Sequence, residues 1–236
     1  MTDYELQVMN SLTVESIIKG IVDETSKWNL KTADYITLAN AFLDLSLNKP
    51  IINNQSRDLK ENISPQKIEL PLTGELIKIR TFNRETDFEF TNKWLNDEVG
   101  RWFLLSRSYT RDTNFNELID DSRNIIGLIT LQDSTPIGLM GYLDYDKIHQ
   151  KAEMRKLIGE EKQRGKGYAK EATKLWIQYG INSLGLKKIF LNTIENNIRN
   201  VTLNKELGFQ VEGILRKECV IDNKSYDLLR MGLIVE

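Results

Sequence analysis

The segment Arg-Gly-Lys-Gly-Tyr-Ala at residues 164–169 constrains the fold more than any other part of the chain. Its two glycines stand between a stretch typical of a strand, residues 152–159, and a stretch typical of a helix. A loop that enters a helix in this way presents backbone N–H groups without acceptors inside the helix. The helix is predicted because apolar residues recur on one helical face: Tyr168, Ala172, Leu175, Trp176 and Tyr179.

These N–H groups and the positive end of the helix dipole predict a site for an anion, above all a phosphate. Gly165 and Gly167 would let the anion approach the backbone, and Arg164 and Lys166 add positive charge. Taken alone, the segment also fits a tight basic turn. It matches neither the P-loop pattern nor the three-glycine pattern of dinucleotide-binding folds.

Composition predicts a soluble globular protein with one large domain, or a domain with an appendage. The chain has 236 residues, of which 40% are hydrophobic and 28% are charged. A net charge of −2 does not favour nucleic acid or an anionic membrane as a partner. The sequence shows neither a signal-peptide pattern nor a long apolar run, and its single cysteine, Cys219, suits a reducing compartment. We therefore expect a cytoplasmic protein.

Metal chemistry is not expected, because His149 and Cys219 are the only histidine and the only cysteine. His149 lies in the polar turn 146–151, where we expect a structural or solvent-facing role.

Residues 1–48 are predicted to form a helical N-terminal extension, with Thr13 and Thr32 as helix N-caps. Its two apolar stripes need a partner surface, either the main domain or another chain, which leaves a homo-oligomer open. The extension is interpreted as a packing appendage or as a recognition module. Residues 49–74 have linker composition, ending in a short strand at 67–70 and a turn at 72–74.

From residue 75 the pattern changes to alternating strands and helices, so residues 75–236 are predicted to form the main domain. Helices are expected at 85–99, 113–123, after the glycine loop, and at 197–207. Strands are expected at 76–80, 124–131, 137–145, 152–159, 188–192, 209–220 and 224–235.

This order, with the glycine loop at its centre, resembles the GNAT superfamily of acetyl-coenzyme A-dependent N-acetyltransferases. Residues 164–169 match the pattern Gln/Arg-x-x-Gly-x-Gly/Ala, and Asn197 stands eleven residues before Gly208 of a Leu-Gly-Phe segment, as in the family. Ala152-Glu153 and residues 94–99 are further matches, as are Glu212-Gly213 and Tyr226-Asp227. The resemblance covers about residues 75–236. It is strongest to the branch of ribosomal-protein N-terminal, spermidine and amino-sugar acetyltransferases.

The resemblance implies an α+β fold in which a splayed mixed sheet, flanked by helices, holds acetyl-coenzyme A in its opening. The pyrophosphate would accept hydrogen bonds from the N–H groups of Gly165 to Ala169, and the pantetheine arm would run beside Leu157 and Ile158 like an added strand. Asn197, which is also a candidate helix N-cap, would hold the arm from the far side. Lys205 or Arg199 would reach a phosphate. The expected cofactor-binding set is Leu157, Ile158, Arg164, Gly165, Lys166, Gly167, Tyr168, Ala169, Asn197 and Lys205.

A protonated amine must lose a proton before it attacks a thioester, and Glu153 is the candidate general base, directly or through water. The competing interpretation is a surface carboxylate beside Lys151 or Arg155. The family's usual Tyr, which protonates the thiolate, is replaced by Asn204. Water, another tyrosine (Tyr142, Tyr168 or Tyr226) or no acid would take its place. The segment 160–163 is one residue longer than usual, which could bulge the strand end or shift the loop.

The predicted function is acetyl transfer from acetyl-coenzyme A to a primary amine by direct attack in a ternary complex. The alternative is a catalytically degenerate acyl-coenzyme A-binding sensor or scaffold. A polyamine, a protein N-terminus and an amino-sugar nucleotide are all left open as substrates. Nucleic-acid binding is weakly supported, because no basic patch with interleaved aromatic residues is present.

Overall fold

The computed structural model describes residues 3–28, 30, 32–46, 67–97, 100, 115–194, 198–221 and 223–235. The chain divides into two compact units, Met1–Ile51 and Ile52–Glu236.

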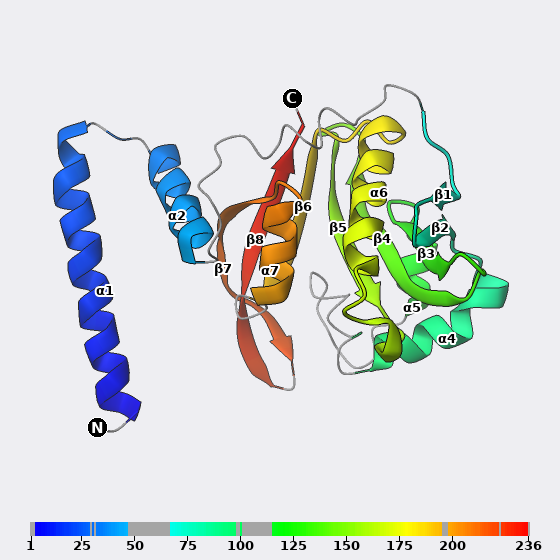
Figure 1. Ribbon diagram of the computed structural model, residues 1–236, viewed down its shortest axis with the longest axis horizontal. Coiled ribbons are helices and arrows are strands. Elements are labelled where there is room, and N and C mark those ends of the chain that lie inside the picture. The colour runs from blue at the N-terminus through cyan, green and yellow to red at the C-terminus, as the bar shows by residue number, and fades with distance from the viewer. Residues whose placement is uncertain are drawn as a thin grey trace. The chain divides into compact units, whose positions relative to one another are not determined.

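The first unit consists of helix α1 (Asp3–Thr25), the short 3₁₀ turn η1 (Ser26–Trp28) and helix α2 (Thr32–Ser46) (Figure 1). The predicted cap at Thr13 is wrong, because α1 runs through it; the preceding residues include good helix formers and neither Gly nor Pro. Helix α2 begins at Thr32, so Thr32 is its first helical residue instead of the predicted N-cap. The two helices contact each other where the Thr25 and Tyr35 hydroxyls lie 3.4 Å apart. Four residues of the α1 stripe have exposed side chains: Val14, Ile17, Ile18 and Val22.

The second unit is an eight-stranded sheet with the order β1-β2-β3-β4-β5-β6-β8-β7. All neighbouring strands are antiparallel except β5 and β6, which are parallel. The predicted mixed sheet flanked by helices is therefore confirmed. The strands are β1 (Leu72–Thr73), β2 (Ile77–Thr81), β3 (Ile125–Leu131), β4 (Pro136–Asp146), β5 (Lys151–Ile158), β6 (Lys188–Ile194), β7 (Gln210–Ile221) and β8 (Lys224–Ile234).

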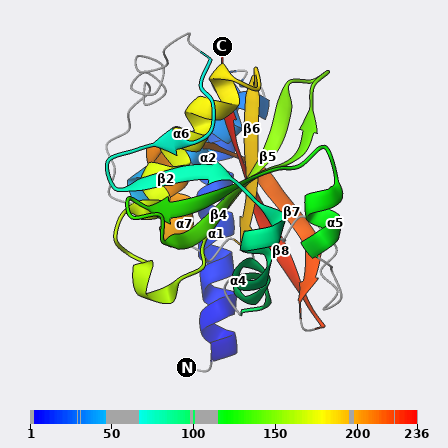
Figure 2. The same cartoon turned by 90° about the vertical axis from the view of Figure 1, so that its right-hand side faces the viewer.

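Helices cover both faces of this sheet (Figure 2). On one face, α6 (Tyr168–Asn182) and α7 (Ile198–Glu206) pack in a core centred on Trp176. On the other face, α4 (Arg84–Asn96) and α5 (Phe115–Asp120) pack in a second core that contains Trp94. Within the described residues, both α4 and α5 are shorter than predicted; α5 ends at Asp120, where the Asn124 amide donates to the Leu118 carbonyl.

The chain from Lys67 already belongs to this unit. Ile68 and Leu70 pack against the α6-side core, and the Ile68 N–H donates to Ser183 Oγ at 3.0 Å. The predicted turn at 72–74 is wrong, because Leu72 and Thr73 form strand β1 beside β2. Residues 49–66 of the predicted linker lie outside the described residues.

The sheet opens between β5 and β6. Their pairing covers only Lys151 to Glu153 on β5, with Glu153 opposite Phe190 on β6. Strand β5 nevertheless continues to Ile158 with β4 as its partner on the other side, and β6 continues to Ile194 beside β8. We call the diverging segments, 154–158 of β5 and 191–194 of β6, the β5–β6 fork. It is the splay that the sequence predicted.

Candidate active site

The glycine loop presents five consecutive backbone N–H groups, those of residues 165–169, that have no acceptor among the described residues. Gly165 and Gly167 have φ angles of 80° and 87°, a backbone conformation that favours glycine. A Cβ atom added at either position would meet nothing within 4 Å, so the space beside the loop is open. The loop therefore has the amides and the room for an anion at the start of α6.

The extra residue before the loop is absorbed by the 3₁₀ turn η3 (Glu161–Gln163). Strand β5 stays in register with β4 as far as Ile158, so the strand end that could have bulged is regular. The Arg164 side chain fixes the loop to that strand end, because its guanidinium donates to the carbonyls of Ile158 and Gly159 at 3.0 and 3.1 Å. The Lys166 ammonium donates to Gln163 Oε1 at 2.8 Å, within the loop.

The loop lies at the end of β5 that borders the fork. From Met154 to Ile158, β5 pairs with β4 on one edge and lacks the β6 partner on the other. The Leu157 side chain is buried in the α4-side core, whereas Ile158 packs on the α6 side. The backbone edge of these residues can therefore receive an extended ligand as a strand would, by hydrogen bonds to amides.

Glu153, the candidate base, lies at the base of the fork and is buried rather than at the surface. Its carboxylate lies 2.5 Å from Arg155 Nη2 and accepts a hydrogen bond from Asn192 Nδ2 at 2.9 Å. Arg230 donates to Asn192 Oδ1 at 3.0 Å, and its guanidinium lies over the Phe190 ring. This cluster contains two guanidinium groups and one carboxylate.

Lys156 is a candidate site residue that the sequence analysis did not name. It lies on β5 inside the fork, and its ammonium donates to Asn204 Oδ1 of α7 at 2.6 Å. Burial lowers the pKa of Lys156 to about 7. The available signal was a lysine in an otherwise buried strand, on the same side as Ala152 and Met154 by the two-residue alternation.

Other predicted residues have different surroundings. Lys205 is buried, and its ammonium lies 3.4 Å from Gln210 Oε1. Asn197 lies outside the described residues. The Tyr142 hydroxyl is fully buried and donates to the Trp176 carbonyl at 2.8 Å, which removes Tyr142 as an acid for the fork. Tyr226 belongs to β8 and packs against the cluster of Cys219 and Leu228, with the Lys224 ammonium over its ring.

Among the described residues, no group of three or more His, Cys, Asp or Glu side chains could hold a metal. None of the helices in the described part of the chain is both long and apolar enough to span a membrane.

A splayed mixed sheet whose opening borders a loop of free amides is the arrangement of a protein that binds an extended phosphorylated ligand. Residues 77–210 match the acetyltransferase (GNAT) domain family, and the chain belongs to this family. The resemblance seen in the sequence is thus confirmed. The protein is an N-acetyltransferase that moves an acetyl group from acetyl-coenzyme A to a primary amine.

Among known proteins, the chain is 27% identical over 158 residues to spermidine N(1)-acetyltransferase of Escherichia coli K12, covering 66% of this chain and 84% of that protein. It is 30% identical over 146 residues to the spermidine N(1)-acetyltransferase of Vibrio cholerae, covering 62% and 70%. A crystal structure of the Vibrio cholerae spermidine N-acetyltransferase with coenzyme A and spermine matches with 25% identity and a TM-score of 0.56, covering 68% and 95%.

Proposed function

We propose that acetyl-coenzyme A binds with its diphosphate on the amides of residues 165–169 and its pantetheine arm along the open edge of β5. The observation that carries this proposal is the set of five unpartnered N–H groups beside the fork. A diphosphate supplies acceptors for the amides, and the arm's own amide groups need partners that an unpaired strand edge offers. The thioester then lies inside the fork.

In this arrangement a neutral primary amine attacks the thioester carbonyl directly. The carbonyl oxygen gains negative charge, which a backbone N–H of the open β5 edge would stabilise. Glu153 is the proposed base at the base of the fork. Because its carboxylate already contacts Arg155 and Asn192, we propose that it takes the amine proton through a water molecule.

Spermidine is the first acceptor to test, because the relatives with known substrates act on it. One observation favours a second class of acceptor. In the cluster at the base of the fork, the described residues Arg155 and Arg230 outnumber the carboxylate of Glu153. Excess positive charge repels a polycation and attracts an amine that also carries an acidic group, such as an amino acid or a phosphorylated amino sugar.

The experiment measures release of the coenzyme A thiol with a panel of spermidine, spermine, amino acids and amino-sugar phosphates, and coenzyme A binding by calorimetry. Turnover of any amine, with binding lost in Gly167→Trp, supports the proposal. Higher kcat/KM for spermidine would identify a polyamine as the acceptor, and higher kcat/KM for acidic amines would identify the second class of acceptor. Tight binding without turnover of any amine would instead establish the sensor or scaffold alternative.

We propose that residues 1–48 are a separate extension through which copies of the chain associate. A solved structure of a spermidine N-acetyltransferase from Vibrio cholerae is dodecameric, and here four apolar residues of α1 have exposed side chains. Sedimentation of the full chain tests this. The double variant Ile17→Gln, Ile18→Gln should lower the oligomeric state, whereas an unchanged state would show that the stripe is not an interface.

A further inference from the structure

Lys156 lies on the α7 side of the fork. Side chains alternate along β5, so Lys156 points to the face opposite Glu153 and Arg155. It lies three residues beyond Glu153, the last residue paired with β6. Its Nζ contacts Asn204 Oδ1 at 2.6 Å, which places the ammonium between β5 and α7 beside the open edge.

The ammonium has no carboxylate partner among the described residues. On α7, the charged neighbours of Asn204 are Lys205, which lies against Gln210, and Glu206, which pairs with Lys170 of α6. On β4, the residue opposite Lys156 is Met140. A partly buried cation with only an amide as its partner is unfavourable by itself, and burial lowers its pKa to about 7. Such a group gives up its proton readily near neutral pH.

The Asn204 amide is held so that its oxygen faces Lys156. Asn204 Nδ2 lies 3.4 Å from Asn200 Oδ1, and Asn200 Nδ2 donates to Thr193 Oγ1 of β6 at 3.1 Å. This chain of hydrogen bonds runs from β5 across α7 to β6, so it links the two strands that border the fork. It holds one ionisable proton donor beside the open edge of β5.

We propose that Lys156 donates the proton to the coenzyme A thiolate that leaves during acetyl transfer. The inference rests on the proposed function, because it needs the thioester in the fork. The amine nitrogen forms a bond to the acyl carbon and the carbon–sulfur bond breaks. The sulfur takes the electron pair and a proton from the ammonium of Lys156, which becomes a neutral amine. The proton of the attacking amine leaves to Glu153 or water, and solvent reprotonates Lys156.

The test compares Lys156→Met, Lys156→Arg and the control Lys174→Met, an exposed lysine of α6. Both Lys156 variants should lower kcat by about 10- to 100-fold while coenzyme A affinity stays within about threefold. Arginine keeps the positive charge but is too weak an acid to protonate the thiolate. The activity of Lys174→Met should equal that of the wild type.

A pH profile separates proton donation from a structural role. The wild-type rate should fall as pH rises through the pKa of Lys156, and this descending limb should be missing in Lys156→Met. Asn204→Asp should move the limb to higher pH, because a carboxylate favours the ammonium form.

Three results would overturn the proposal. They are full activity of Lys156→Arg, an unchanged pH profile in Lys156→Met, or stable acetylation of Lys156 by acetyl-coenzyme A detected by mass spectrometry. The last result would make Lys156 an acceptor instead of a donor. An inactive wild type on every amine would contradict the proposed function itself, so the two failures are distinguishable.

Discussion

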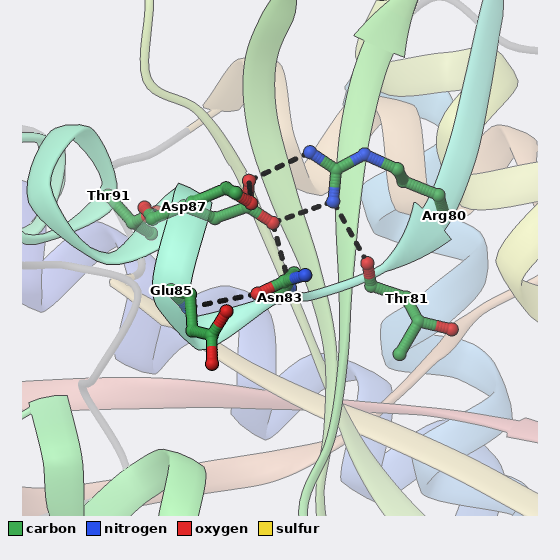
Figure 3. Close-up of polar contacts among 7 residues, drawn as sticks. Arg80, Thr81, Asn83, Glu85, Asp87 and Thr91 are labelled. Atoms are coloured by element: carbon green, nitrogen blue, oxygen red, sulfur yellow. Dashed lines mark hydrogen bonds and ion pairs between the residues drawn. The ribbon is translucent and has the colours of Figure 1, made fainter.

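Arg80 and Asp87 form a bidentate ion pair between β2 and the first turn of α4, with Nη1–Oδ2 at 2.6 Å and Nη2–Oδ1 at 2.8 Å (Figure 3). The Asp87 carboxylate is buried and also accepts the Asn83 N–H at 2.8 Å. Asn83 in turn caps α4 by accepting the Glu85 N–H. One carboxylate thus fixes where α4 begins relative to the sheet.

We expect Asp87→Asn to lower the free energy of unfolding by about 1–3 kcal/mol, because Arg80 loses its charged partner while the shape is kept. The matched control is Asp120→Asn, which removes the exposed ion pair with Arg84. This variant should lower the free energy of unfolding by less than about 1 kcal/mol. Urea unfolding at pH 7 measures both. Equal losses in the two variants would contradict the role of burial.

The same pair predicts a pH dependence. Burial acts to raise the pKa of Asp87, but the hydrogen bonds from Arg80, Asn83 and Thr86 and the charge of Arg80 lower it overall. A lowered pKa means that the stabilisation is present above the unfolded value, near 3.9, and is lost as pH falls through the lower folded value. The stability difference between wild type and Asp87→Asn should therefore shrink below about pH 4. A difference that is constant down to pH 2 would argue against this assignment.

Variants at Gly167 and Gly185 distinguish an effect on cofactor binding from an effect of backbone strain. Both have positive φ, 87° and 68°, and an added Cβ would meet nothing closer than 4.0 Å at either position. Tryptophan at each should lower the free energy of unfolding by about 1–2 kcal/mol. Only Gly167→Trp should weaken coenzyme A binding, by at least tenfold in calorimetry, because only it fills the space beside the loop amides. Similar affinities in both variants would exclude the loop as the diphosphate site.

Glu153→Gln tests the proposed base and its ion pair together. The variant leaves the buried Arg155 without a countercharge, so we expect a loss of about 3–5 kcal/mol in the free energy of unfolding. If Glu153 also accepts the amine proton, turnover should fall more at pH 7 than at pH 9.5, where more of the amine is already neutral. Initial rates at both pH values measure this, and an equal loss would leave Glu153 with only the structural role.

The lowered pKa of Lys156 predicts that the free energy of unfolding rises with pH. Its folded pKa, about 7, is below the unfolded value, so the unfolded chain binds more protons between about pH 7 and pH 10.4 and stability increases across that window. Lys156→Met lacks the group. The free energy of unfolding of wild type relative to Lys156→Met should therefore increase from pH 7 to pH 10, measured by urea unfolding. A difference between the two proteins that does not change with pH would show that the Lys156 ammonium is well solvated.

Local sequence patterns predicted most elements of the main unit. The apolar face of α6, the two glycines before it and the strand patterns around it depend on neighbouring residues, whose periodicity follows from backbone geometry. The same reasoning misplaced the start of α1 and the turn at 72–74, because no local signal marks where a helix is prolonged or where an edge strand finds its partner.

The sequence by itself determined the family, the order of strands and helices and the glycine loop, since these are written in residues that are close along the chain. Only the tertiary structure decided that β5 and β6 part after Glu153, that this carboxylate is buried against Arg155, and that Lys156 meets Asn204. The physical reason is that the ionisation and the partners of a buried side chain depend on atoms brought together by folding, and Lys156 and Asn204 are forty-eight positions apart in the chain.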